Sequence, residues 1–175
     1  PAEIRDPGGK GDHLFTSSIV ALNPDTGEYV WHYQQVQRDT WDYTAVQQIT
    51  VADLSIDGRE RHVIMQAPKN GYFYVLDAAT GELVSAEPIV TTLNWSTGID
   101  KATGRPIMNP AARYDVTGKP LIAVPHFGGA HNWPPMSYSP VTGLVYIPTN
   151  EFSYPFVLAR QDDNPMGQKL NISFA

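Results

Sequence analysis

Short runs of apolar and β-branched residues, separated by turn residues, cover most of the chain and are typical of β-strands. The clearest stretch begins at residues 49–56, where apolar and polar residues alternate. It continues through the two-residue turn signal Asp57-Gly58 to three further runs that end at residue 84. We therefore interpret residues 48–87 as four successive antiparallel strands, with parts of a similar unit on either side. Helix signals are weak throughout the chain.

A turn motif recurs along the chain: an apolar or aromatic residue, then Asp, Asn or Ser, two further residues and Thr-Gly. Asp or Asn accepts hydrogen bonds from the backbone just ahead of it, and Gly adopts the positive φ that closes the turn. The copies lie at residues 22–27, 76–81, 99–104 and 138–143, and 54, 23 and 39 residues separate successive glycines. Four-stranded sheets repeated around an axis are the blades of a propeller, and unequal gaps indicate insertions. A generic all-β architecture is the alternative, and the third copy can also be a turn within an insertion.

Composition supports the strand prediction. The 14 Gly and 15 Pro make up 29 of 175 residues, about 17%, and aromatic residues account for 11%. Typical chains have about 12% Gly plus Pro and about a quarter charged residues, whereas this chain has 17% charged residues. The composition favours a turn-rich β protein and excludes a coiled coil or a disordered chain. Residues 88–130, rich in Pro, Gly, Thr and Asn, are expected to form a long irregular connection.

Charge and residue usage exclude several classes of function. The net charge is −6 with only 12 Lys plus Arg, so we expect neither nucleic-acid binding nor attraction to an anionic membrane. No apolar run approaches the length of a transmembrane helix, and the absence of Cys excludes a thiolate metal site in this stretch. Of the five His, only His126 and His131 are spaced closely enough to be ligands of one zinc ion, on a loop that leaves them unconstrained, so a zinc site is not expected. Nucleotide-binding glycine motifs are absent. The chain starts at Pro1 without a signal segment, so we expect it to be an internal fragment.

Several motifs, in order along the chain, resemble the quinoprotein alcohol dehydrogenase family, which uses pyrroloquinoline quinone (PQQ). Residues 21–31 resemble its tryptophan-docking repeat, in which Trp31 would stack on the peptide of a Gly in the next blade. Trp41-Asp42-Tyr43 resembles the family's Trp-Asp-Tyr segment, residues 67–77 its Pro-(Lys/Arg)-Asn-Gly strand, and residues 129–133 its His-Asn segment. One such motif alone is weak, whereas three in the right order are specific.

The resemblance implies a fold and a function. Members are eight-bladed β-propellers that bind PQQ and usually Ca²⁺, and they oxidise primary alcohols to aldehydes in the bacterial periplasm. We expect residues 1–175 to be about two to three blades of one such domain, with no second domain and no activity alone. Electrons would pass to a cytochrome c, or to haem c in a C-terminal domain outside this chain. Many methanol dehydrogenases have Arg at the position of Lys69. Lys at this position resembles the ethanol-type enzymes, including the quinohaemoproteins.

Asp42 is the candidate catalytic residue. It lies on a polar, aromatic loop between two strand patterns, where Trp41 and Tyr43 could exclude water and raise the pKa of its carboxyl. A loop Asp that bonds its own backbone is the commoner alternative. By resemblance, Asp42 takes the hydroxyl proton while hydride moves to the quinone, and its carboxylate also ligates or approaches Ca²⁺. Lanthanide-dependent relatives have a second Asp two residues later, where this chain has Thr44, which favours Ca²⁺.

Three further residues are candidates for cofactor binding through the resemblance. Lys69 matches the cation beside the quinone oxygens, although an exposed turn Lys is the simpler interpretation from sequence alone. Asn132 matches a cofactor contact, with turn formation before Pro134 as the alternative, and Trp133 either lines the cofactor cavity or packs structurally. The family often has His where this chain has Pro134.

Two other functions remain open at this point. A non-catalytic propeller of the outer-membrane assembly type could use the same docking repeats as a scaffold, although it would not need Asp42, Lys69 and Asn132 together. A related quinoprotein acting on sugars or other polyols is the nearer alternative.

Overall fold

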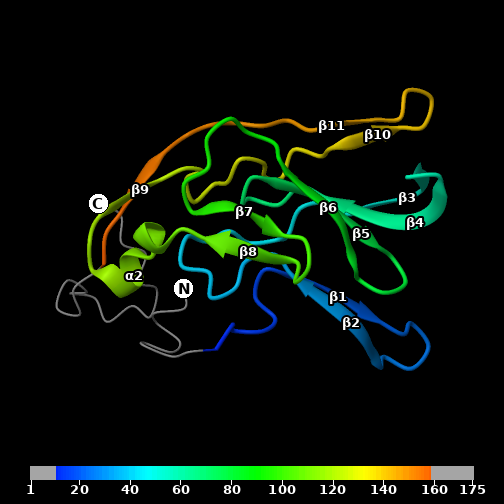
Figure 1. Ribbon diagram of the computed structural model, residues 1–175, viewed down its shortest axis with the longest axis horizontal. Coiled ribbons are helices and arrows are strands. Elements are labelled where there is room, and N and C mark those ends of the chain that lie inside the picture. The colour runs from blue at the N-terminus through cyan, green and yellow to red at the C-terminus, as the bar shows by residue number, and fades with distance from the viewer. Residues whose placement is uncertain (1–10, 159–175) are drawn as a thin grey trace.

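The computed structural model describes residues 11–158, most of whose regular structure is short β-strands (Figure 1). The elements are β1 (Ser18–Leu22), β2 (Tyr29–Gln34), β3 (Thr50–Ile56), β4 (Arg59–Gln66), β5 (Tyr72–Asp77), β6 (Leu83–Pro88), β7 (Ser96–Asp100), β8 (Arg105–Met108), the 3₁₀ helix η1 (Pro110–Ala112), α2 (Tyr114–Thr117), β9 (Leu121–Ala123), β10 (Ser137–Ser139), β11 (Leu144–Tyr146) and β12 (Tyr154–Phe156). In this part of the chain, no helix is long and apolar enough to cross a membrane.

The predicted four-stranded unit is confirmed. Strands β3, β4, β5 and β6 form one antiparallel sheet in sequence order, which spans Thr50 to Pro88. The β3–β4 turn is closed by Asp57 and Gly58, both with positive φ, as the Asp-Gly signal predicts. This sheet is a complete propeller blade, and the hairpins β1–β2 and β10–β11 lie beside it on opposite sides (Figure 1).

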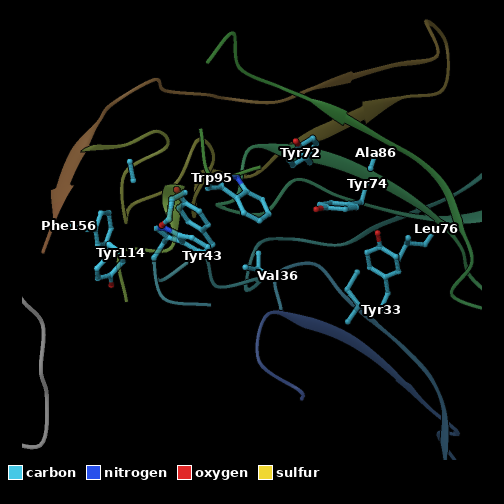
Figure 2. Packing of buried hydrophobic residues seen from close by; sticks show 14 of the residues in the cluster. Tyr33, Val36, Tyr43, Tyr72, Tyr74, Leu76, Ala86, Trp95, Tyr114 and Phe156 are labelled. Carbon is cyan, nitrogen blue, oxygen red and sulfur yellow. The ribbon is translucent and has the colours of Figure 1, made fainter. Parts of the chain in front are cut away.

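Alternation along β5 explains how the central sheet packs on both hairpins. Tyr72, Tyr74 and Leu76 face a cluster that includes the buried residues of β1 and β2 (Figure 2). Phe73 and Val75 face a second cluster, which also contains hydrophobic residues of β10 and β11. Because a strand with two apolar faces is buried on both sides, the sheet needs a neighbour on each side, as a blade in a propeller does.

The tryptophan-docking interaction takes the form that the resemblance implies. Trp31 of β2 lies against Gly81 in the β5–β6 turn, so closely that a Cβ added at Gly81 would approach Trp31 Cε3 within 2.6 Å. The indole Nε1 also donates a hydrogen bond to the carbonyl of Ala78 at 3.2 Å. Tyr33 repeats the pattern two residues later, because its hydroxyl donates to the carbonyl of Gly104 at 2.6 Å. The third Thr-Gly turn is therefore a docking turn as well.

The expectation of an irregular connection over residues 88–130 is wrong in part. This segment contains the hairpin β7–β8, η1, α2 and β9, and β9 pairs with the distant strand β12. Sequence patterns missed the hairpin because a bulge between Ser96 and Ile99 interrupts its alternation. The turn after α2 is closed by Gly118 with φ of 66°. These elements place Trp95 and Tyr114 in the main core (Figure 2).

Candidate functional site

The loop that carries Asp42 is fixed by the aromatic residues on either side of it. Trp41 and Tyr43 are fully buried and stack on each other, with ring centroids 5.7 Å apart. Trp41 Nε1 donates to the carbonyl of Ala112 at 3.2 Å, and the hydroxyl of Tyr43 donates to that of Pro125 at 2.5 Å. Asp42 lies between them with a positive φ of 65°, and 58% of its side chain is exposed. The expectation that the two rings exclude water from this carboxylate is therefore wrong, because they anchor its backbone instead.

A second carboxylate, that of Asp39, accepts hydrogen bonds from the backbone of the same loop, and the sequence patterns did not predict this role. The half-buried Asp39 accepts a hydrogen bond from the backbone N–H of Trp41 at 3.0 Å and another from that of Tyr43. Its two partners bracket Asp42, so the Asp39 carboxylate fixes the peptides on both sides of the candidate base. Burial raises the pKa of Asp39 to about 6, against the opposing effect of the two N–H donors, and the negative charge of Asp42 adds to the rise. The local signal is the Asp-x-Trp spacing of an Asx turn.

We expect Asp39 to make stability depend on pH. A carboxyl whose pKa is higher in the folded than in the unfolded state contributes stability that is full below about pH 4 and lost as the pH rises through about 6. The shift corresponds to at most about 3 kcal/mol, at about 1.4 kcal/mol for each pKa unit. In the complete protein, the thermal midpoint of the wild type should fall relative to that of Asp39→Asn between pH 4 and pH 7. A difference between the two midpoints that stays constant over this range would contradict the assignment.

Lys69 lies beside Asp42, as expected of two residues of one site. Its Nζ donates to Asp42 Oδ2 at 3.2 Å and to the carbonyl oxygen of Asp42 at 3.1 Å. Only 11% of its side chain is exposed, so the interpretation as an exposed turn Lys is wrong. Asp42 and Lys69 are 27 residues apart but come together because the β2–β3 and β4–β5 connections leave the same end of the sheet. The ion pair fixes the direction in which both side chains point.

Asn70, next to Lys69, has a structural role. Its side chain is fully buried, donates to the hydroxyl of Tyr74 at 2.8 Å and accepts from the N–H of Tyr72 at 3.1 Å. Its carbonyl accepts from Trp95 Nε1 at 2.8 Å. These bonds hold the turn that presents Lys69.

The segment 129–133 lies against Lys69. The N–H of Ala130 donates to the carbonyl of Lys69 at 2.9 Å, and Gly129 is so close that an added Cβ would approach Lys69 Cα within 2.5 Å. Asn132 Nδ2 donates to the carbonyl of Gly128 at 2.7 Å, whereas its buried Oδ1 has no hydrogen-bond partner in residues 11–158. Trp133 is 83% exposed, so the interpretation as an internal packing residue of the described chain is wrong.

Two histidines near Lys69 complete the surroundings of the site. Burial lowers the pKa of His126, and the nearby ammonium of Lys69 lowers it further, against the opposing effect of a hydrogen bond with Asn150. His131 is 1% exposed, with Nδ1 at 2.5 Å from the carbonyl of Ala67 and Nε2 at 2.8 Å from that of Pro134. Sequence reasoning gave His131 no role, because these carbonyl partners leave no signal in the sequence.

Metal ligands are few in this part of the protein. Within residues 11–158, no group of three or more His, Cys, Asp or Glu side chains is placed to hold a metal ion. Among the residues described, the carboxylate of Asp42, of which Oδ2 faces Lys69, offers a hard oxygen ligand at the site. Any Ca²⁺ bound here would need further ligands from elsewhere.

Comparisons with known proteins identify the arrangement. The family model for the β-propeller domain of glucose/ethanol/alcohol dehydrogenases, which is named for PQQ, matches residues 7–92. Quinohemoprotein alcohol dehydrogenase ADH-IIG of Pseudomonas putida is 59% identical over 145 residues, which cover 82% of this chain and 20% of that protein. Its solved structure superimposes with a TM-score of 0.83 at 57% identity, over 87% of this chain and 22% of that one. The chain belongs to the PQQ-dependent alcohol dehydrogenase family.

Two further similar proteins show the same pattern of coverage. The 1-butanol dehydrogenase (cytochrome c) of Thauera butanivorans is 49% identical over 91% of this chain and 22% of its own length. A europium-containing methanol dehydrogenase of known structure is 35% identical with a TM-score of 0.77, over 83% of this chain and 25% of that one. The chain thus spans about a fifth of the length of these curated relatives.

Proposed function

We propose that this protein oxidises primary alcohols to aldehydes with PQQ as cofactor and Ca²⁺ as metal. The observation that carries the proposal is the pair of Asp42 and Lys69, in which an exposed carboxylate on an anchored loop lies 3.2 Å from a largely buried ammonium. The relatives named as alcohol dehydrogenases support it. We also infer that residues 1–175 belong to a single propeller domain, although residues 1–10 and 159–175 lie outside the described structure.

The described residues fit a quinone. Asn132 has a buried amide oxygen without a protein partner and lies on the segment that contacts Lys69. Two hydrogen bonds to Asp42 leave the ammonium of Lys69 a third N–H for a quinone oxygen. The exposed ring of Trp133, next to Asn132, offers a flat apolar surface. We propose that Lys69, Asn132 and Trp133 hold the cofactor.

The proposed roles follow from charge and proton-accepting capacity. When bound, PQQ supplies a hydride acceptor, and Ca²⁺ supplies a Lewis acid next to it. The carboxylate of Asp42 accepts the proton of the alcohol hydroxyl, and its exposure leaves room for the substrate. The ammonium of Lys69 stabilises negative charge that develops on the cofactor, and its limited exposure strengthens this effect. Asp39 holds the backbone of Asp42 in place while the proton moves.

Ca²⁺ is the proposed metal because position 44 carries no charge. A trivalent ion needs more negative ligands than a divalent one, and this chain has Thr44 where the lanthanide-dependent relatives have a second Asp. Asp42 would be one oxygen ligand of Ca²⁺. The other ligands would come from residues outside those described.

Two partners and a location complete the proposal. The names of the relatives, one a quinohemoprotein and one a dehydrogenase for cytochrome c, support transfer of electrons to a cytochrome c or to a haem c of the same protein. We propose a periplasmic location, in keeping with the family resemblance.

Reconstitution of the complete protein tests the proposal. The apo form is titrated with PQQ in the presence of Ca²⁺ and again in EDTA, and alcohol-dependent reduction of a dye or of cytochrome c is then measured. We expect stoichiometric, Ca²⁺-dependent binding, with faster turnover of ethanol and 1-butanol than of glucose or glycerol. Absence of PQQ binding would favour a non-catalytic scaffold, whereas preference for the polyols would replace the proposed substrate class.

A further inference from the structure

His131 has an arrangement of partners that a neutral imidazole cannot satisfy. Its two ring nitrogens face the carbonyl oxygens of Ala67 and Pro134, at 2.5 and 2.8 Å, and the side chain is almost fully buried. A carbonyl oxygen only accepts hydrogen bonds, so each ring nitrogen must donate. A neutral imidazole has a single N–H, and it would leave one lone pair facing a carbonyl oxygen.

We propose that His131 is a buried imidazolium and a positioning residue, which fastens the loop of Asn132 and Trp133 to the chain segment just before Lys69. The part of this inference that concerns the cofactor rests on the proposed function. The part that concerns the protonation of His131 stands on the two carbonyl contacts alone.

The place of His131 in the chain explains what it positions. Ala67 is two residues before Lys69, and Pro134 is two residues after Asn132. The imidazole of His131 therefore links the segment just before Lys69 to the segment just after Asn132. The N–H of Ala130, which donates to the carbonyl of Lys69, is a second attachment one residue before His131. Together the two attachments fix how far the ammonium of Lys69 lies from the free amide oxygen of Asn132. A cofactor held by both groups would need this distance to be constant.

Burial disfavours the charged form of His131, so its protonation depends on its two carbonyl partners and on the charges nearby. Lys69 is cationic but paired with Asp42, and the pKa of His126 is lowered, which favours the neutral form of that neighbour. The positive charge of His131 is compensated by the dipoles of its two carbonyl partners. It also adds positive charge on the side of the site where PQQ, an anionic quinone, is proposed to bind. We therefore expect His131 to raise the affinity for PQQ both by positioning Asn132 and by its charge.

The protonation state is tested by NMR of the complete apo protein with isotope-labelled histidine. The signals of His131 are those lost in His131→Gln, or in His131→Asn if the first variant does not fold. We expect both ring nitrogens to show the chemical shifts of protonated nitrogen at pH 7.5. Shifts of a neutral tautomer would overturn the proposal, whether or not the protein binds PQQ.

The positioning role is tested by PQQ affinity. The amide of Gln donates to at most one of the two carbonyls at ideal geometry and carries no charge, so we expect His131→Gln to bind PQQ about 10- to 100-fold more weakly. His62→Gln is the matched control, because His62 is exposed on β4 and pairs with Asp53 away from the site. We also expect the PQQ affinity of the wild type to fall when His131 loses its proton at high pH, and His131→Gln to lack this part of the fall, since Lys69, Asp42 and His126 are unchanged. Equal PQQ affinities with equal pH profiles for wild type and His131→Gln would overturn the positioning role. A wild type that binds no PQQ would instead overturn the proposed function, and the NMR result would still hold.

Discussion

Asn in place of Asp42 is expected to lower kcat for alcohol oxidation by about a thousandfold while PQQ stays bound at unchanged stoichiometry. General-base catalysis contributes roughly 10²- to 10⁴-fold, and an amide of the same shape cannot accept the hydroxyl proton. The fold should tolerate the change. Asn adopts a positive φ such as the 65° of Asp42 readily, and its amide oxygen can still accept the hydrogen bond of Lys69.

A matched control and a contrary outcome complete the Asp42 experiment. Asp53→Asn is the control, because Asp53 is exposed on β3 and pairs with His62. Its kcat should equal that of the wild type when measured with the same alcohol and dye. Turnover of Asp42→Asn near the wild-type rate, with PQQ bound, would show that another group takes the proton.

Gly129→Ala is expected to weaken PQQ binding by at least about a hundredfold and to destabilise the protein. A Cβ at this position would lie 2.4 Å from Lys69 Cβ and 2.5 Å from Lys69 Cα, and Lys69 can relieve that clash only by moving its backbone. The φ of 83° at Gly129 adds strain of about 1–2 kcal/mol for any residue with a Cβ. Displaced Lys69 would leave Asp42 without its partner and the cofactor without its cation.

Gly143→Ala separates these two effects. Gly143 has a similar φ of 68° in the last Thr-Gly turn, but nothing lies within 4 Å of an added Cβ. This variant should therefore show the cost of the backbone conformation alone, about 1–2 kcal/mol, with unchanged PQQ affinity. Thermal unfolding and PQQ titration of both variants check the prediction. Equal PQQ affinities for the two variants would show that the contact with Lys69 does not matter.

Local patterns predicted the parts of the fold that depend on local chemistry. The alternation and Asp-Gly turn of residues 48–87 were enough to place the blade β3–β6, and the family resemblance was enough to dock Trp31 on a glycine. The hairpin β7–β8 was missed because a bulge disturbs its alternation. The strand pair β9–β12 was missed because its partners lie about 30 residues apart and are three residues long.

The candidate site was predictable by residue type but not by surroundings. The resemblance assigned Asp42 and Lys69 to one cofactor site, and the structure brings them within hydrogen-bond distance, whereas their proposed roles stay a prediction. Whether Trp41 and Tyr43 cover the carboxylate of Asp42 depends on which way each side chain points. Both rings are buried in the main core and leave the carboxylate exposed. Asp39 and His131 were missed because backbone N–H and carbonyl groups, which every residue has, are their partners.

The two ends of the sheet β3–β6 carry residues with different roles. Asp42 and Lys69 lie on the connections at one end of the sheet. The docking glycine Gly81 and the tight turn at Asp57 lie at the other end, about 20 Å away along strands of six to eight residues. We therefore expect mutations at the docking end to change how blades assemble, and mutations at the other end to change the proposed chemistry, with little interference between the two. A substitution that alters substrate preference at the first end would then leave the contacts between neighbouring blades unchanged.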